Sequence, residues 1–406
     1  MKIVITTLFG IEAVTADELL ELGFDRDQFE LSDGQVVLEA GDAVADVALA
    51  VARTNVFLRT AERVLLQLAE FPATEFEMLF DRTLKLPWEK WIPAGYAFHI
   101  NGYSRKSRLF GISACQSLIK KAIVRRLLVS RGQSEDGMLA EDPSLGLIRV
   151  QFSIVSDQVR MMVDTSGDGL HKRGYRPLQH EAPIKETLAA AILRLARFRP
   201  FGEEALLDPM CGSGTFPIEA ALIARHQAPG MHRPFAAERW PFIGQRAFDL
   251  AREEAFGKID PRVPEKIFIF GSDLAPQAVA VAQANAQRAG VADLIDFRQM
   301  DVLTVKAARL PEQTGYDRHL IVCNPPYGDR LLDEDQAIAL HEGLIRTFLD
   351  RGQARPEIRF NVITPLESFE QMAGAKADKR RKLYNGMIKC TLYQYFRQSH
   401  HQKERS

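Results

Sequence analysis

Residues 1–165 combine two hydrophobic patterns in short segments. Segments in which apolar and polar residues alternate predict strands, and apolar residues that recur every three or four positions predict helices. The clearest helix covers 113–130, where an apolar stripe runs from Leu118 to Leu127. Further helices are expected at 11–22 and 42–52, and strands at 2–7, 35–39, 63–67, 97–101, 147–152 and 158–164. This part of the chain is therefore predicted to be α+β.

The pattern changes after 165–170 (TSGDG and its neighbours), a stretch of small and polar residues typical of a boundary. Strands and helices then alternate regularly. Helices are expected at 184–197, 214–225, 276–289 and 334–351, and strands at 204–208, 267–272, 295–299, 319–323 and 358–364. Such alternation predicts a mostly parallel, doubly wound, Rossmann-like α/β sheet with helices on both faces.

Charge is segregated along the chain although the net charge is only −1. Residues 1–60 hold eleven acidic side chains and four basic ones, whereas the window 97–131 holds eight basic side chains and no Asp or Glu. This distribution predicts one surface that binds a polyanion such as RNA. The candidate RNA-binding residues are Arg105, Lys106, Arg108, Lys120, Lys121 and Arg125.

The cysteines and the hydropathy pattern restrict the other classes of protein. Four single cysteines without a C-x-x-C pair indicate neither a zinc site nor a disulfide framework, and no metal ligand set is expected. The chain begins without a signal-peptide pattern, and no window has the roughly 18 uncharged apolar residues of a membrane helix. We expect a cytoplasmic protein, and the sequence leaves its oligomeric state open.

The first chemical motif follows the strand at 204–208, which ends in Asp208 and turns through glycines into a helix. Glycines let a ligand approach the backbone, and a helix start offers free N–H groups to an anionic group. The spacing fits neither G-x-G-x-x-G nor a Walker A motif. A turn without a ligand remains an alternative. The turn residues are Pro209, Cys211, Gly212, Ser213, Gly214 and Thr215.

Two further carboxylates follow the next predicted strands. Asp273, followed by Leu274, ends one strand, and an acidic side chain at this place can accept both hydroxyls of a ribose. A helix begins shortly afterwards, so Asp273 is also a candidate helix cap. Asp301, after the strand at 295–299, is a candidate acceptor for an adenine amino group.

The third motif, Asn324-Pro325-Pro326-Tyr327, indicates the reaction. An exocyclic amine on a base ring is a poor nucleophile because its lone pair is delocalised. The Asn324 side-chain oxygen and the Pro325 carbonyl can accept its two hydrogens, the prolines stiffen the loop, and Tyr327 offers a stacking face. Positioning of this kind can supply about 7–11 kcal/mol of the barrier.

Together the three motifs resemble the aminomethylating class I methyltransferases, whose marker is an Asn/Asp-Pro-Pro-aromatic loop. The resemblance implies S-adenosylmethionine as cofactor. It implies that Asp208 and the turn up to Thr215 bind the donor, that Asp273 binds its ribose, and that Asp301 contacts its adenine. Asn324, Pro325, Pro326 and Tyr327 would form the catalytic loop.

The flanking segments resemble a narrower family, the THUMP-domain guanine-N2 RNA methyltransferases. HKRGYR at 171–176 and APIKETLAA at 182–190, which includes Pro183 and Thr187 as cofactor-binding candidates, match the region before the donor site. The closing strand pair around 384–390 matches as well. The resemblance implies a ferredoxin-like subdomain at 1–60, a THUMP RNA-binding domain at 61–165 and a methyltransferase domain at 170–406, acting on guanine N2, most simply in ribosomal RNA.

Several alternatives remain open from the sequence. The same loop serves adenine N6 in DNA or RNA, or guanine N2 in transfer RNA, and a non-catalytic RNA-binding factor could retain the fold. Cys323 and Cys211 are interpreted as buried packing residues, and the basic run 379–382 either meets phosphate or is a solvated charge run. The insertion 226–262 could contact RNA, cover the pocket or pack on the sheet edge.

Overall fold

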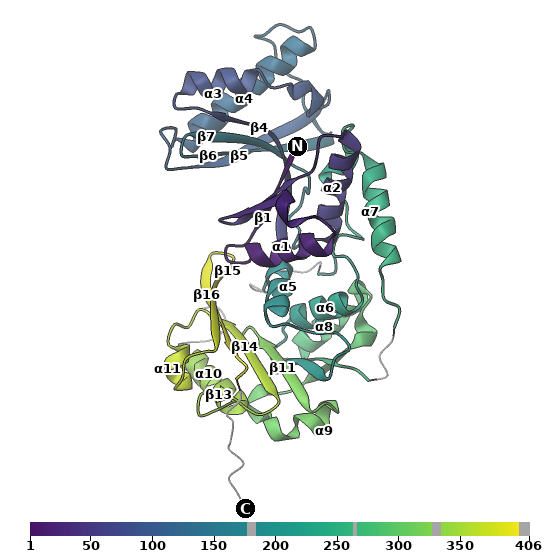
Figure 1. The fold of residues 1–406 in the computed structure, drawn as a ribbon, viewed down its shortest axis with the longest axis vertical. Coiled ribbons are helices and arrows are strands. Elements are labelled where there is room, and N and C mark those ends of the chain that lie inside the picture. The colour runs from purple at the N-terminus through teal and green to yellow at the C-terminus, as the bar shows by residue number, and fades with distance from the viewer. Residues whose placement is uncertain (177–183, 263–265, 327–333, 398–406) are drawn as a thin grey trace, which may run out of the picture. The chain divides into compact units, whose positions relative to one another are not determined.

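The computed structural model describes residues 1–176, 184–262, 266–326 and 334–397. Its contacts divide the chain into two units. The first unit comprises 1–7, 16–170 and 233–255, and the second comprises 8–15, 171–232 and the residues from 256 onward. Each unit has one large sheet, and Figure 1 shows their elements along the chain.

The first unit is built on a seven-stranded sheet in the order β2-β3-β1-β4-β7-β6-β5, in which only β5 and β6 pair in parallel. β4 pairs with β1 on one side and β7 on the other, so one sheet runs through both of the N-terminal segments expected from the sequence. The strands are β1 (Lys2–Thr7), β2 (Phe29–Ser32), β3 (Gln35–Glu39), β4 (Ala61–Pro72), β5 (Tyr96–Arg105), β6 (Asp142–Val155) and β7 (Gln158–Asp164). The helices are α1 (Glu12–Glu21), α2 (Val44–Phe57), α3 (Phe76–Leu84), α4 (Ile112–Ser130) and α7 (Gln245–Gly257).

The insertion contributes to the first unit through residues 233–255. Buried Arg233 donates to the carbonyls of Asp168 and Gly169, each over 2.8 Å. Arg53 of α2 forms an ion pair of 2.7 Å with Glu254 of α7. Hydrogen bonds and an ion pair with residues far away in the sequence therefore fix this segment. Its local hydrophobic pattern could not predict where it packs, because these partners lie in other segments.

The second unit has the sheet order β10-β9-β8-β11-β14-β16-β15. The strands from β10 to β14 are parallel, and β16 is antiparallel to both of its neighbours. The strands are β8 (Glu204–Asp208), β9 (Ile269–Asp273), β10 (Ile295–Gln299), β11 (Arg318–Cys323), β14 (Ile358–Thr364), β15 (Lys379–Asn385) and β16 (Ile388–Tyr395). The helices are α5 (Glu186–Leu195), α6 (Thr215–Ala224), α8 (Pro276–Ala289), α9 (Leu310–Thr314), α10 (Glu334–Phe348) and α11 (Phe369–Ala373), and a small hairpin joins β12 (Leu349–Asp350) to β13 (Gln353–Ala354).

Side chains of the central strands alternate between two buried cores, one on each face of this sheet. Leu206 belongs to the core that includes residues of α5, α6 and α8, and Leu207 to the core that includes residues of α10 and α11. Both faces are covered, which is why these strands read as continuous apolar runs in the sequence. The expected Rossmann-like α/β fold with an N-terminal α+β part is confirmed.

Differences from the expected elements lie mainly at their ends. The expected helix 334–351 ends at Phe348, where β12 begins, and α2 extends to Phe57 instead of 52. Helices α3 and α7 and strand β2 were not anticipated, since their short apolar patterns are weak without their tertiary partners.

Candidate active site

The carboxyl ends of β8 and β11 form a topological switch point. β8 lies between β9 and β11, and the chain continues to β9 on one side and returns to β11 on the other. Leu207 is level with Ile321 in the parallel pairing, so Asp208 and the Asn324 corner follow adjacent strands at nearly the same height. Ligands of open α/β sheets bind at such points.

The carboxylate of Asp208 is almost completely buried, since only 2% of the residue's surface is exposed. Its Oδ1 accepts the backbone N–H of Met210 over 3.2 Å. Burial raises the pKa of Asp208 well above its usual value, and the negative charge of Asp273 raises this pKa further. A nearby cationic group would stabilise the ionised form, so the position suits the positively charged end of a ligand.

The glycine turn combines a packed position with an open one. Gly214 has φ +83°, and a Cβ there would lie 2.9 Å from the Cβ of Ala282. Gly212 has φ +52°, and a Cβ there would meet nothing within 4 Å. Gly214 is thus required for packing, whereas Gly212 leaves space into which a ligand can approach the backbone.

The other turn residues hold this shape. Cys211 donates its N–H to the carbonyl of Ser272 over 2.8 Å. The Ser213 and Thr215 hydroxyls lie 3.4 Å apart, and Thr215 begins α6, whose N-terminus has no side-chain cap. Pro209 lies within the turn between Asp208 and Met210. The first N–H groups of α6 are therefore available to an anionic group.

Asp273 connects this turn to the next strand. Its Oδ2 accepts the N–H of Gly212 over 2.9 Å, and its Oδ1 accepts the N–H of Ala275 over 3.0 Å. The side chain thus bonds to Ala275, the residue before α8, and it also fixes the glycine turn. Asp273 is not the helix cap that the alternative interpretation expected, because the N-cap of α8 is Ala275 and no side chain of the described residues caps it. Leu274, 66% exposed, follows Asp273 and offers an apolar surface beside the turn.

Asp301 follows β10 and caps a short 3₁₀ helix at Val302–Thr304. Its Oδ1 accepts the N–H of Leu303 over 2.9 Å. Asp208, Asp273 and Asp301 therefore follow three neighbouring strands, β8, β9 and β10, at one edge of the sheet.

Asn324 follows the fully buried Cys323 at the end of β11. The Oδ1 atom of Asn324 is buried and accepts no hydrogen bond from the described residues. A buried acceptor without a partner is costly, and its position at the switch point provides an acceptor for a ligand N–H. Pro325 is buried and Pro326 is half-buried, while Tyr327 lies outside the described residues.

The cysteines of this region are unsuited to nucleophilic chemistry. Burial raises the pKa of both the Cys323 and the Cys211 thiol well above the usual value, and the charge of Asp208 acts in the same direction on each. Both thiols are neutral near pH 7, and both side chains are buried, as expected from the sequence.

A buried charged cluster, not assigned from the sequence, lies behind the turn. Arg176 forms an ion pair of 3.0 Å with Glu186 and donates to the Thr215 hydroxyl over 3.1 Å. Burial raises the pKa of Glu186 to about 7 although Arg176 lowers it. Glu186 and the fully buried Thr187 begin α5, and Pro183 lies outside the described residues. The charged residues before the apolar run of α5 are the signal that could have identified this cluster.

The predicted RNA-binding cations of the first unit fall into two groups. Lys106, Arg108 and Lys121 are exposed and form no ion pair within the described part of the chain. Three others are paired with carboxylates from outside the basic window: Arg105 with Asp33 at 3.9 Å, Lys120 with Glu141 at 3.6 Å, and Arg125 with Glu135. The positive surface is therefore weaker than the linear charge pattern indicated.

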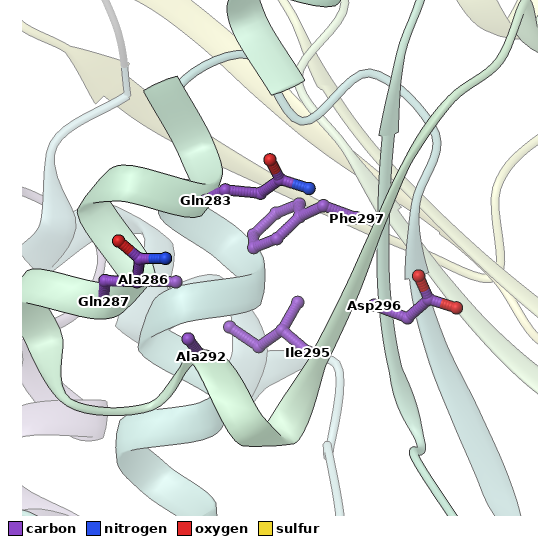
Figure 2. A pocket seen from close by; sticks show the side chains of 7 residues that line it. All are labelled: Gln283, Ala286, Gln287, Ala292, Ile295, Asp296 and Phe297. Atoms are coloured by element: carbon purple, nitrogen blue, oxygen red, sulfur yellow. The ribbon is translucent and has the colours of Figure 1, made fainter. Parts of the chain in front are cut away.

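A depression of about 390 Å³ lies elsewhere on the second unit, between the second half of α8 and the start of β10 (Figure 2). Its lining includes Gln283, Gln287 and Asp296. Asp273 and Asp301 instead follow the carboxyl ends of β9 and β10, so this depression is not the site defined above. Among the described residues, no group of three His, Cys, Asp or Glu side chains could hold a metal ion, and no helix is long and apolar enough to cross a membrane.

The fold and the site define a class I methyltransferase. The edge fits S-adenosylmethionine, because it combines the open approach at Gly212 and the buried Asp208 with two groups that lack a side-chain partner in the described part of the chain, the N-terminus of α6 and the Asn324 oxygen. Asp208, the turn 211–215 and Asp273 would hold this donor, which supplies an electrophilic methyl group when bound.

Family models identify the chain more closely. The RMKL-like methyltransferase domain matches 173–394, the RlmL ferredoxin-like domain matches 2–65, and the THUMP domain matches 73–133. The chain therefore belongs to the RMKL-like methyltransferase family, and S-adenosylmethionine is its cofactor.

Individual relatives agree with this assignment. The chain is 39% identical to a "Putative RNA methyltransferase YpsC" of Bacillus subtilis, covering 100% of this chain and 98% of that protein. It is 33% identical to a "Ribosomal RNA large subunit methyltransferase K/L" of Syntrophotalea carbinolica over 97% of this chain, and it spans only 53% of that relative.

Solved structures cover nearly the whole chain as well. "SMU.472, a putative methyltransferase complexed with SAH" has a TM-score of 0.82 at 36% identity and covers 97% of each chain. A "predicted N6-adenine-specific DNA methylase" of Listeria monocytogenes has a TM-score of 0.83 at 38% identity, covering 97% of this chain and 96% of that one.

Proposed function

We propose that this protein transfers a methyl group from S-adenosylmethionine to the exocyclic N2 of a guanine in large-subunit ribosomal RNA. The observation that carries the proposal is the Oδ1 of Asn324, which is buried at the switch point beside Asp208 and has no hydrogen-bond partner among the described residues. An acceptor held there orients an NH₂ group without the need to deprotonate it.

The residues act mainly by positioning. The Asn324 oxygen and the Pro325 carbonyl accept the two amine hydrogens, which directs the nitrogen lone pair toward the methyl group. The amine nitrogen forms the new bond as the sulfur–methyl bond breaks, and the proton leaves to water afterwards. Since Cys323 and Cys211 are neutral thiols, no covalent enzyme intermediate is required.

RNA as the substrate class is supported by the THUMP match at 73–133 and by the exposed cations Lys106, Arg108 and Lys121. The names of the K/L relatives support ribosomal RNA, and a ribosomal RNA substrate supports a cytoplasmic location. The N-terminal domains at 1–60 and 61–165 would hold the RNA, while the domain at 170–406 performs the transfer. Reaching Asn324 requires the target base to leave its stack, at a cost of a few kcal/mol.

A mass-spectrometric comparison of nucleosides from wild-type and deletion cells tests this function. We expect N²-methylguanosine to decrease in ribosomal RNA and to remain unchanged in transfer RNA. Loss from transfer RNA alone would replace the substrate with a transfer RNA guanine. Unchanged N²-methylguanosine in both pools would refute the proposal.

Adenine N6 is the second candidate, because the Asn-Pro-Pro corner serves either amine and the similar Listeria monocytogenes protein is described as a predicted N6-adenine-specific DNA methylase. Transfer of a labelled methyl group to adenine in duplex DNA, without transfer to ribosomal RNA, would favour this candidate.

A further inference from the structure

The hairpin of β15 and β16 carries exposed basic side chains and a half-buried aromatic one, Tyr384, that the proposed reaction does not use. Lys382 is exposed, and its ammonium lies 5.8 Å from the centre of the Tyr384 ring. At the tip, Met387 is 97% exposed and Ile388 42% exposed. Aromatic and cationic side chains together are typical of surfaces that bind single-stranded nucleic acid.

The strand register places this hairpin at the same edge as Asn324. Lys382 pairs with Thr391, which pairs with Thr364 at the carboxyl end of β14. Val362 of β14 is level with Cys323 of β11. Thr364 lies two residues after Val362, and Pro325 lies two residues after Cys323, so Thr364 and Pro325 are level as well. Lys382 and the catalytic corner are therefore level, and three strand spacings, about 14 Å, separate them.

The order of the strands determines from which side a nucleic acid can approach. The donor-binding residues follow β8, β9 and β10, on one side of β11. β14, β16 and β15 form the other half of the same edge (Figure 1). A base presented to Asn324 must come from the half that the donor leaves free, and that half ends in the hairpin.

The cations of the hairpin differ in how far they are neutralised. Arg380 pairs with Glu370 at 3.1 Å and Lys389 pairs with Glu367 at 2.7 Å. Lys382 forms no ion pair within 4.0 Å among the described residues, although its charge contributes to the lowered pKa of Glu367. Lys382 is therefore a cation at this edge that, among the described residues, no carboxylate neutralises, so it is available to a phosphate.

Protection of an edge strand does not explain Lys382. Charged residues often prevent an exposed edge from pairing with another chain. Segment 8–10 of the same unit lies against β15 and already covers this edge. Arg381 donates to the Gly10 carbonyl over 2.6 Å, and a Cβ on Gly10 would lie 2.9 Å from the Lys382 carbonyl. The neighbouring Phe9 is 49% exposed and adds a second aromatic ring to this segment.

We propose that Lys382 and Tyr384 form a contact for the RNA strand that flanks the target nucleotide, with Lys382 at a phosphate and Tyr384 stacked on an unpaired base. The inference rests on the proposed function and adds a second RNA contact, within the catalytic unit itself. The separation of about 14 Å corresponds to about four steps of 3.4 Å along one strand of a stacked helix.

Steady-state methylation of in vitro transcribed large-subunit ribosomal RNA tests the contact, with Lys382→Glu and Tyr384→Leu as the variants. Lys376→Glu is the matched control, because Lys376 is also exposed but precedes β15 at the opposite edge of the sheet. We expect Lys382→Glu to lower kcat/KM roughly tenfold at low salt and less at high salt. Tyr384→Leu should lower it about fivefold or more.

Conservative variants and donor binding separate this role from a structural one. Lys382→Arg and Tyr384→Phe should keep most of the activity, and the affinity for S-adenosylhomocysteine should be unchanged in all variants. Equal kcat/KM values for Lys382→Glu, Tyr384→Leu and Lys376→Glu would overturn the contact while leaving the proposed function intact. If the wild type methylates no RNA but Lys382→Glu still weakens RNA retention on filters, the contact stands and the proposed reaction fails.

Discussion

The backbone N–H of Gly212 donates to the Asp273 carboxylate over 2.9 Å, although 61 residues separate the two. This bond joins the turn after β8 to the end of β9. The carboxylate expected to bind the ribose therefore also shapes the turn that is proposed to bind the rest of the donor. Asp273 keeps lone pairs beyond those used by Gly212 and Ala275, so both functions can coexist.

The two glycines of the turn should respond differently to substitution. Both Gly212→Ala and Gly214→Ala place a side chain at positive φ, which costs about 1–2 kcal/mol. Gly214→Ala adds a clash with Ala282 and should lower the free energy of unfolding by at least 1 kcal/mol more, as measured by denaturant titration. Gly212→Ala should instead lose donor affinity, measured by calorimetry. Equal stability losses would contradict this division.

Asn324→Ala should abolish methyl transfer while donor binding stays within about twofold, because only the amine acceptor is removed. Single-turnover transfer from labelled donor measures the first quantity, and calorimetry with S-adenosylhomocysteine measures the second. RNA affinity should also persist. Activity near that of the wild type would show that Asn324 does not orient the amine.

Asp208→Asn should stabilise the donor-free protein and weaken donor binding. Burial raises the pKa of Asp208, so ionising this side chain carries a cost in the folded state that Asn avoids. A gain of about 1 kcal/mol would raise Tm by roughly 1–2 °C in a chain of this length. The loss of a charge-assisted contact to the cationic donor should reduce affinity about 10–100-fold. Wild-type donor affinity should also rise with pH, whereas the variant's should not.

Glu186→Gln should flatten the pH dependence of stability. The folded-state pKa of about 7 lies above the ordinary 4.5, so the folded protein holds this proton more tightly. The associated stability is complete below pH 4.5 and is lost as pH rises through 7. Between pH 5.5 and 8, the wild type should lose about 2 kcal/mol more unfolding free energy than the variant. Parallel curves for the two proteins would contradict the assignment.

Substitutions that change the charge of the first unit should distinguish cations without an ion pair in the described part of the chain from paired ones. Lys121→Glu should weaken RNA binding several-fold and reduce the slope of log affinity against log salt by about 1. Arg125→Ala should change affinity less, because its partner Glu135 already neutralises it. Filter binding across a salt series measures both. A larger effect at Arg125 would show that RNA displaces Glu135.

The local sequence determined much of this protein. Strand ends followed by Asp208, Asp273, Asp301 and Asn324 were predictable because buried parallel strands produce continuous apolar runs, and the residues that follow them must meet at one edge of the sheet. The class of fold follows from those motifs and their order, and the donor follows from their resemblance to the class I methyltransferases.

Only the tertiary structure decided which polar and charged groups form hydrogen bonds or ion pairs with one another. The Gly212–Asp273 bond, the Arg176–Glu186 cluster and the neutralisation of Arg125 all join residues distant in sequence or in separate segments. The placement of 8–15 in the second unit and of 233–255 in the first has the same origin. Hydrophobic periodicity reports how each segment is buried, whereas contacts between segments depend on how the whole chain packs.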